Sequence, residues 1–200
     1  MLKHVFTKLP KNSTVNWLNP PPYWETDMGL CRMKPASGTD FWRETYFGHT
    51  ADNGHALLAS FCSNIVISTD VIFSPQHDYD QAGLMIRLSD KNWIKFSVEL
   101  EPDKTIKLGT TVTSQGISDW SGEVIATIDT LIAPITLIAE ISSGACLLSM
   151  RQGDELAQTV RITPLPLVKS NEAWAGIYAA CPRESGFIAN FENTSMRTRK

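Results

Sequence analysis

Short runs in which apolar and polar residues alternate recur from about residue 56 to the end of the chain. An alternation with a period of two is typical of β-strands that bury one face. No window of a dozen residues carries apolar residues at helical spacing. The expected strands are 56–62, 64–73, 80–88, 92–101, 105–113, 123–128, 135–141, 145–151, 156–162, 173–180 and 187–191. Turn-forming sequences such as 101–104 (EPDK) separate them, so the pattern predicts an all-β sandwich built from antiparallel meanders.

Two stretches depart from this pattern. Residues 130–141 are apolar enough for a buried helix, but Pro134 would remove a backbone donor from its interior, so we expect a loop followed by a strand. Residues 1–55 contain a Pro-rich segment and three of the six tryptophans. We expect them to wrap around the sandwich. A length of 200 residues suits one large β domain, so we expect a single domain over residues 1–200.

Alternation sorts the side chains of two central strands onto two faces. One face carries Ala82, Leu84, Ile86, Leu88, Ile94, Phe96, Val98 and Leu100. The other carries Gln81, Gly83, Met85, Arg87, Trp93, Lys95, Ser97, Glu99 and Glu101. A polar and aromatic face of this kind is most often the solvated outside of a sheet. It can also bind flat polar ligands such as sugars, because an indole ring stacks on the sugar while polar groups bond its hydroxyls.

Glu99 and Glu101 lie two residues apart on the polar face, which invites a comparison with glycosidases. Catalytic carboxyl groups lie ~5–5.5 Å apart in retaining and ~6.5–9.5 Å apart in inverting enzymes, so the spacing is compatible with either class. Glu101, however, precedes Pro102 at a strand end, where we expect it to be solvated. We expect Lys95 to keep Glu99 ionised, whereas a general acid requires a raised pKa. An ion pair on the sheet face is the favoured interpretation.

Other candidate chemistry in the chain is weak. His49 and His55 flank Asp52, but their spacing matches no known metal-ligand signature, and the intervening Asp-Asn-Gly favours a tight turn. The cysteines, at positions 31, 62, 146 and 181, form no CxxC pair, and we expect them to be reduced thiols. The sequence contains no GxSxG, HExxH, P-loop or GxGxxG motif. We therefore expect no metal and no cofactor.

Charge and hydropathy narrow the class of partner. The net charge is −3, and the only tight basic cluster is formed by Arg197, Arg199 and Lys200 at the end of the chain. This argues against binding to nucleic acid or to an anionic membrane. No stretch approaches the ~20 apolar residues of a membrane span, and the first ten residues lack the apolar core of a signal peptide. With the unpaired cysteines, these features lead us to expect a cytoplasmic protein.

Several blocks resemble, in order and spacing, those of one known family. They are 40–45 (DFWRET), 52–55 (DNGH), 79–84 (YDQAGL), 93–99 (WIKFSVE), 111–113 (TVT), 118–121 (SDWS) and 181–187 (CPRESGF). The family is a domain of unknown function in the concanavalin A-like lectin/glucanase superfamily, and the resemblance covers roughly residues 17–193. It implies a jelly-roll sandwich of two curved antiparallel sheets, with the blocks clustered on the concave side.

The resemblance also implies a binding site and a role. The candidate ligand-binding residues are Asp40, Trp42, His55, Gln81, Lys95, Glu99, Asp119 and Trp120, and the strand-face argument adds Trp93. Glucanases of the superfamily place two catalytic carboxylates four residues apart on one strand, but Lys95 stands four residues before Glu99, so we expect no catalytic residues. A fungal member is associated with regulation of enolase. This implies a non-catalytic regulator of carbohydrate metabolism, galactose or glycolytic, with enolase or a small carbohydrate as its partner.

Two other interpretations stay open. The first is a carbohydrate-binding or glycan-hydrolysing enzyme of the same superfamily, which would use Glu99 with Asp119 or Glu101. The second is a purely structural interaction protein, which would be favoured if the N-terminal segment filled the concave face and left no pocket. The position of the carboxyl groups and the presence of a pocket distinguish the three.

Overall fold

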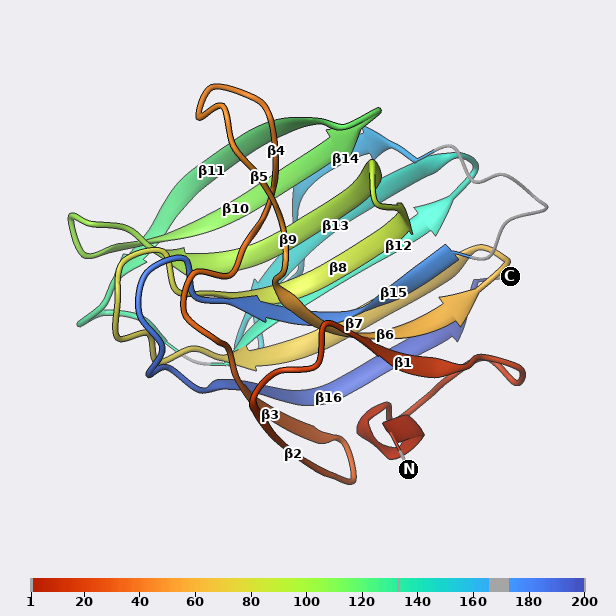
Figure 1. Cartoon of the computed structure of the whole chain (residues 1–200). Helices are drawn as coiled ribbons and strands as arrows, with labels where there is room; N and C mark the ends of the chain where they lie inside the picture. The colour runs from red at the N-terminus through yellow and green to blue at the C-terminus, as the bar shows by residue number, and fades with distance from the viewer. Residues whose placement is uncertain (1, 133, 166–172, 200) are drawn as a thin grey trace.

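In residues 2–132, 134–165 and 173–199, which the computed structural model describes, two seven-stranded antiparallel sheets pack face to face (Figure 1). The front sheet has the order β1 (Val15–Leu18), β6 (His55–Phe61), β15 (Ala173–Ala180), β8 (Gln81–Ser89), β9 (Asn92–Leu100), β10 (Thr105–Ser114) and β11 (Ile117–Thr127). The back sheet has the order β14 (Gln158–Pro164), β13 (Ala145–Gln152), β12 (Ile135–Ser142), β7 (Ile65–Ile72), β16 (Ala189–Thr198), β3 (Leu30–Lys34) and β2 (Tyr23–Asp27). The predicted all-β jelly-roll sandwich is confirmed.

The main core lies between the two sheets and follows the alternation in the sequence. Ile94, Phe96 and Val98 of β9 point into it together with the apolar face of β8, as predicted. Strands β8 to β11 form a continuous meander. The faces of these strands that point away from the main core therefore lie side by side on the outside of the molecule. That outer face carries the candidate site.

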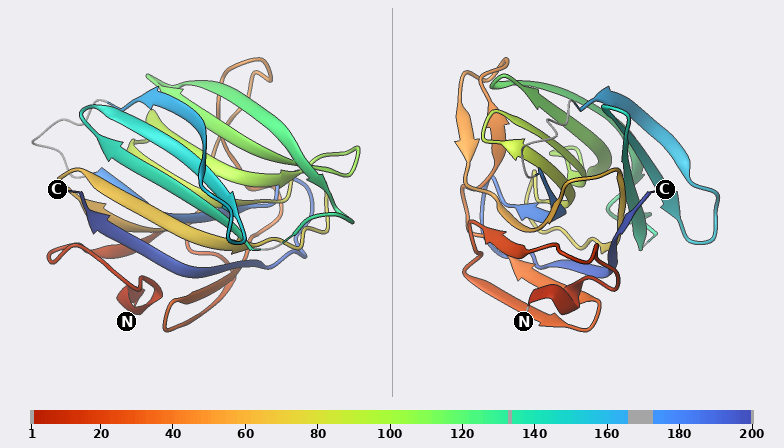
Figure 2. Two further views of the ribbon diagram at one scale, coloured as in Figure 1. Left: turned by 180° about the vertical axis from the view of Figure 1, so that it is seen from behind. Right: turned by 90° about the vertical axis from the view of Figure 1, so that its right-hand side faces the viewer.

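The N-terminal residues form strands that the alternation did not predict. β1 pairs with β6 at one edge of the front sheet, and β2 and β3 complete an edge of the back sheet. A short hairpin of β4 (Phe41–Arg43) and β5 (Thr50–Asp52) lies over the outer face of the front sheet (Figure 2). The chain opens with a single 3-10 turn at Leu2–Val5, and no helix in the described residues is long and apolar enough to cross a membrane.

A second, smaller apolar cluster lies on the outer face of the front sheet, beneath the hairpin. Its buried members are Phe41, Ala56, Leu58, Met85, Trp93 and Tyr178. The sequence predicts a polar and aromatic face along the whole of β8 and β9, and that prediction is wrong for the half covered by β4 and β5. The hairpin buries apolar side chains of β6, β8, β9 and β15 there, and the polar site is confined to the remaining half.

Candidate functional site

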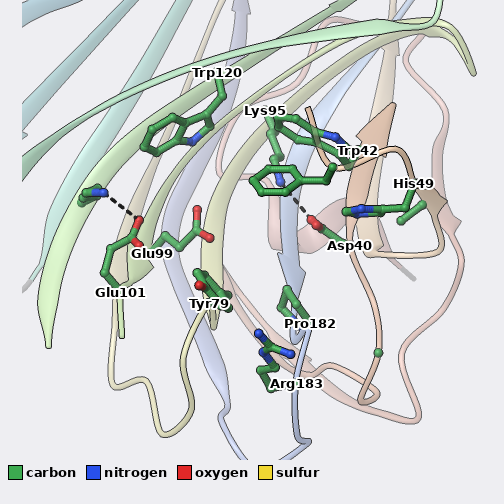
Figure 3. Close-up of a pocket in the computed structure, with 14 residues that line it drawn as sticks. Asp40, Trp42, His49, Tyr79, Lys95, Glu99, Glu101, Trp120, Pro182 and Arg183 are labelled. Carbon is green, nitrogen blue, oxygen red and sulfur yellow. Dashed lines mark hydrogen bonds and ion pairs between the residues drawn. The ribbon is translucent and has the colours of Figure 1, made fainter. Parts of the chain in front are cut away.

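A pocket of about 570 Å³ opens on the outer face of the front sheet, between the β4–β5 hairpin and strands β9 to β11 (Figure 3). Its aromatic residues are Trp42, Phe47, Tyr79 and Trp120. Its acidic and basic residues are Asp40, His49, Lys95, Glu99, Glu101, Lys107 and Arg183. Gly38, Ala51 and Pro182 complete the lining. The volume is within the usual range for a small-molecule site, about 300–1,000 Å³.

A buried ammonium group supports one side of the pocket. Lys95 is only 4% exposed, and its Nζ donates to Asp40 Oδ1 and to Gln81 Oε1, both at 2.9 Å. The Tyr178 hydroxyl donates to the same Gln81 oxygen at 3.2 Å. Because a buried charge is tolerated only when it is paired and hydrogen-bonded, these partners fix the Lys95 side chain in one direction.

Glu99 lies half-buried in the pocket, next to Gln81 on β8 and Lys107 on β10 in the strand register. Burial raises the pKa of its carboxyl to about 8, and the negative charges of Asp40 and Glu101 add to this rise. Our expectation that Lys95 keeps Glu99 ionised is wrong, because the Lys95 ammonium is committed to Asp40 and Gln81 and its attraction is outweighed. Near neutral pH, Glu99 is therefore mainly a neutral carboxyl group, able both to donate and to accept a hydrogen bond.

Trp120 on β11 forms one wall of the pocket. Its side chain is 39% exposed, and Lys107 Nζ lies 5.2 Å from the ring centroid and 3.2 Å from Glu101 Oε1. The ring crosses β10 over Gly109, where a Cβ atom would come within 3.1 Å of the indole nitrogen. The missing side chain at Gly109 thus lets the indole lie across the strand and present an aromatic surface to the pocket.

The hairpin forms the opposite wall. Trp42 Nε1 donates to the carbonyl oxygen of Thr45 at 3.0 Å, and its ring meets that of Phe47 edge-on with centroids 5.4 Å apart. Phe47 in turn contacts the His49 ring at 5.9 Å between centroids. Phe47 is 62% exposed, so this wall offers aromatic surface to a bound molecule as well as to solvent.

The third side of the pocket is formed by Tyr79 and Arg183. The guanidinium carbon of Arg183 lies 5.4 Å from the centroid of the Tyr79 ring, within the range of a cation–π contact. Tyr79 has a φ of +70°, a left-handed conformation that is uncommon outside glycine. The backbone at this turn therefore holds the ring in an orientation that a regular strand end would not give.

Five of the nine predicted site residues line the pocket, and they are Asp40, Trp42, Lys95, Glu99 and Trp120. Gln81 lies beneath it as a partner of Lys95. Three others lie elsewhere. Trp93 is 1% exposed in the apolar cluster under Phe41. Asp119 points to the opposite side of β11 from Trp120 and pairs with Arg161 at 3.2 Å, because successive residues of a strand face opposite sides.

The third of these, His55, holds two N-terminal segments together. Its Nδ1 lies 2.6 Å from the Asn19 carbonyl oxygen, and its Nε2 accepts the backbone N–H of Ala36 at 3.1 Å. This arrangement corresponds to a neutral ring protonated at Nδ1, and burial lowers the pKa of His55. In the described residues, no group of three or more His, Cys, Asp and Glu side chains is placed to hold a metal ion.

The sequence reasoning missed several lining residues. The pocket is also lined by residues outside the predicted ligand-binding set: Phe47, His49, Tyr79, Glu101, Lys107, Pro182 and Arg183. Of these, Glu101 was named only as a carboxyl of the alternative enzyme, and His49 only as a weak metal ligand. A signal existed for three of the others, because Pro182 and Arg183 belong to the CPRESGF block and Tyr79 opens the YDQAGL block. Nothing in the local pattern of residues 46–49 indicated that a hairpin would carry them over the sheet.

Comparisons with known proteins place this architecture in a family. A family model described as "Protein of unknown function (DUF1349)" matches residues 17–199. The chain is 29% identical over 192 residues to "Regulation of enolase protein 1" of Saccharomyces cerevisiae, covering 96% of this chain and 93% of that protein. The crystal structure of a functionally unknown protein from Saccharomyces cerevisiae superposes with a TM-score of 0.85 at 28% identity, over 93% of this chain and 97% of that one.

More distant structures share the fold only. A xylan beta-1,4-xylosidase from Bacillus halodurans C-125 matches at 16% identity with a TM-score of 0.65, over 86% of this chain but only 33% of the enzyme. The carbohydrate-binding module CBM66 from Bacillus subtilis matches at 11% identity with a TM-score of 0.56, over 91% of this chain and 95% of the module. The architecture is thus the β-sandwich that also occurs in glycosidase and carbohydrate-binding domains.

Proposed function

This chain belongs to DUF1349, a family of proteins of unknown function, and on that premise we propose that it is a non-catalytic, cytoplasmic regulator of carbohydrate metabolism that binds a small polyhydroxylated ligand in the pocket. The metabolism concerned is galactose or glycolytic, with enolase as the regulated enzyme. Support for the regulatory role comes from the name of the yeast relative, which shares 29% of its residues over nearly the whole chain.

The observation that carries the ligand class is the composition of the pocket. The exposed face of Trp120 offers a stacking surface, and the carboxyl of Glu99 lies in the same pocket as a donor and an acceptor. A sugar ring presents flat apolar C–H faces and a rim of hydroxyl groups, which are the counterparts of these two features. An apolar ligand would cover the Glu99 carboxyl and offer no hydrogen-bond partner to its polar atoms.

The carboxyl groups of the pocket favour recognition over hydrolysis. Hydrolysis of a glycoside needs one protonated and one ionised carboxyl group on either side of the scissile bond. Asp40 is 2.9 Å from Lys95, and Glu101 is 3.2 Å from Lys107. Asp119 lies on the other side of β11. Both ionised carboxylates of the pocket are thus held in ion pairs, an arrangement better suited to orienting hydroxyl groups than to attacking a sugar carbon.

A thermal-shift screen of neutral and acidic monosaccharides and their phosphates, followed by calorimetric titration, tests the binding function. A ligand that binds only the folded protein raises the melting temperature by mass action. We expect Trp120→Ala to weaken binding roughly tenfold or more, since stacking and the buried ring area are lost together. Trp24→Ala is the matched control, because Trp24 is 38% exposed and lies on β2 outside the pocket.

Two results of this screen would contradict the proposed binding function. If no sugar or sugar derivative shifts the melting temperature, or if Trp120→Ala and Trp24→Ala bind equally well, the pocket is not a carbohydrate site. Lys95 is unsuitable as a test position, because removing a buried ammonium leaves Asp40 and Gln81 without their shared partner and destabilises the fold. A parallel titration with purified enolase distinguishes regulation by direct contact from regulation through expression.

One observation favours a second candidate, a glycan hydrolase with Glu99 as general acid. The pKa of Glu99 is raised to about 8, as a general acid requires, and Glu101 lies in the same pocket. The test is the release of nitrophenol from a panel of nitrophenyl glycosides by the wild type and by Glu99→Gln. Turnover by the wild type that the variant loses would establish the enzyme, whereas absence of turnover with retained sugar binding favours the recognition protein.

A further inference from the structure

Within the described part of the chain, Arg183 differs from the lysines of the pocket in having no acidic partner. Lys95 pairs with Asp40 and Lys107 pairs with Glu101. Among the described residues, no carboxylate lies within ion-pair distance of the Arg183 guanidinium group. The adjacent acidic residue, Glu184, is directed towards His77, with its carboxylate 3.7 Å from the ring nitrogen Nε2. Arg183 therefore brings a positive charge into the pocket that no described residue neutralises.

The carboxyl groups of the pocket do not cancel the positive charge of Arg183. Asp40 and Glu101 are neutralised by their lysines, and burial, which raises the pKa of Glu99 to about 8, leaves that carboxyl mainly uncharged near neutral pH. The protein as a whole carries a net charge of −3. An excess of positive charge in one pocket of an acidic protein attracts a negatively charged group.

The position of Arg183 suits it to bind a ligand rather than to stabilise the fold. Its side chain is exposed and lies against the Tyr79 ring, 5.4 Å from the centroid. Stacking of this kind restricts the plane of the guanidinium group while its N–H donors stay free. Figure 3 shows Arg183 and Trp120 at opposite ends of the pocket, with Glu99 and Tyr79 between them.

We propose that the ligand of this pocket is a polyhydroxylated molecule that bears a carboxylate or a phosphate, and that Arg183 binds this anionic group while Trp120 stacks on the body of the ligand. The proposal rests on the function proposed above and specifies its ligand class. A guanidinium group can donate two parallel hydrogen bonds to two oxygens of a carboxylate or phosphate, a planar arrangement that a lysine ammonium does not provide. Glu99 can then donate to the ligand without repelling its charge.

Calorimetric titration of the full chain with matched pairs of sugars tests this inference. Glucose is compared with glucuronate and with glucose 6-phosphate, and galactose with galacturonate and galactose 6-phosphate. We expect the anionic member of each pair to bind ~10-fold more tightly or better, the usual effect of a charge-assisted bond at a partly exposed site. The uronate and phosphate arms show which of the two anions the pocket accepts.

Arg183→Gln should remove this preference. We expect the variant to bind the anionic sugars ~10-fold more weakly and the neutral sugars within about twofold of the wild type. Arg32→Gln is the control, since Arg32 is also exposed but lies on β3 of the back sheet. Its affinities should equal those of the wild type.

Two results would overturn the inference, and they are separable from failure of the proposed function. Equal affinity of the wild type for neutral and anionic sugars, or an unchanged preference in Arg183→Gln, removes Arg183 from ligand recognition but leaves a carbohydrate pocket. If the wild type binds no member of any pair, the proposed function fails together with the inference.

Discussion

The protonation of Glu99 is set mainly by burial of its carboxyl, which the neighbouring Lys95 ammonium does not offset. Lys95 lies four residues earlier on the same strand and the same face, so the sequence places a cation beside the carboxyl. In the structure its Nζ is held 2.9 Å from both Asp40 Oδ1 and Gln81 Oε1. Because the Lys95 charge is already paired with Asp40, it offsets little of the free energy that an ionised Glu99 carboxyl would lose on leaving water. Desolvation thus dominates at Glu99 and its pKa is raised to about 8.

This shift makes the stability of the protein depend on pH in a defined direction. The pKa of Glu99 is about 8 in the folded protein and about 4.5 in an exposed carboxyl. Between these values the folded state holds the proton and the unfolded state does not, so the contribution of Glu99 to stability is lost as the pH rises from about 4.5 to 8. One pKa unit of difference corresponds to about 1.4 kcal/mol. We therefore expect the wild type to lose at least about 1 kcal/mol more than Glu99→Gln between pH 5 and pH 8.

Urea unfolding at the two pH values measures this difference. Glu123→Gln serves as the control, because Glu123 is an exposed carboxyl on β11, and the variant should follow the pH dependence of the wild type. A wild type and a Glu99→Gln variant with parallel pH dependence would show that Glu99 is ionised in the folded state, and would remove its role as a hydrogen-bond donor in the pocket.

At the scale of elements, the β4–β5 hairpin completes the pocket, although it has little stability of its own. Each strand has only three residues, and isolated two-stranded hairpins are marginal in water. The hairpin is tied to β8 by Arg87, whose guanidinium group donates to both carboxylate oxygens of Asp52 at 2.7 and 2.8 Å. On its other side, the Arg43 backbone N–H donates to Ser118 Oγ of β11 at 2.9 Å.

Arg87→Lys should loosen the hairpin while leaving the sandwich folded. Lysine keeps the charge but cannot make two parallel bonds to Asp52, a loss worth about 1–2 kcal/mol. We expect faster hydrogen exchange in residues 41–52 and weaker ligand binding, with unchanged exchange in the strands of the back sheet. Arg161→Lys is the control, since Arg161 lies on β14 and bonds Thr110, Ser121 and Asp119 away from the pocket. Equal exchange of residues 41–52 in both variants would show that the Arg87 bonds do not hold the hairpin.

The elements that the sequence predicted are those with local alternation. β8 and β9 bury one face in the main core, so their period of two is visible in the residues themselves. β2 has four exposed residues out of five, and it is a strand because it pairs with β3, which no local pattern reveals. The lack of a local strand pattern also affected the prediction of the site residues. Residues 117–122 were not expected to be part of a strand, so the opposite directions of Asp119 and Trp120 could not be anticipated.

At the scale of the whole molecule, the front sheet separates two apolar clusters with different roles. The main core fills the space between the sheets, with Phe191 of the back sheet fully buried in it. The smaller cluster lies outside the front sheet, where Phe41 of the hairpin packs edge-on against Trp93 and Tyr178 with centroids 6.1 and 6.0 Å apart. Stability of the sandwich depends mainly on the first cluster. The shape of the pocket depends on the second, since Phe41 lies between Asp40 and Trp42.

Substitution of one phenylalanine in each cluster should therefore separate stability from binding. Phe41→Leu and Phe191→Leu each leave an incompletely filled core, and we expect each to lower the free energy of unfolding by about 1–3 kcal/mol. Only Phe41→Leu should also weaken ligand binding, because Phe41 lies between the pocket residues Asp40 and Trp42. The Phe41 ring packs so closely on Gly54 that a Cβ there would lie 2.4 Å from it, and a smaller side chain cannot reproduce this fit. Urea unfolding and calorimetric titration of both variants provide the two measurements. If both variants bind like the wild type, the hairpin holds Asp40 and Trp42 in place without its apolar anchor, and the ties through Arg87 and Ser118 are sufficient to shape the pocket.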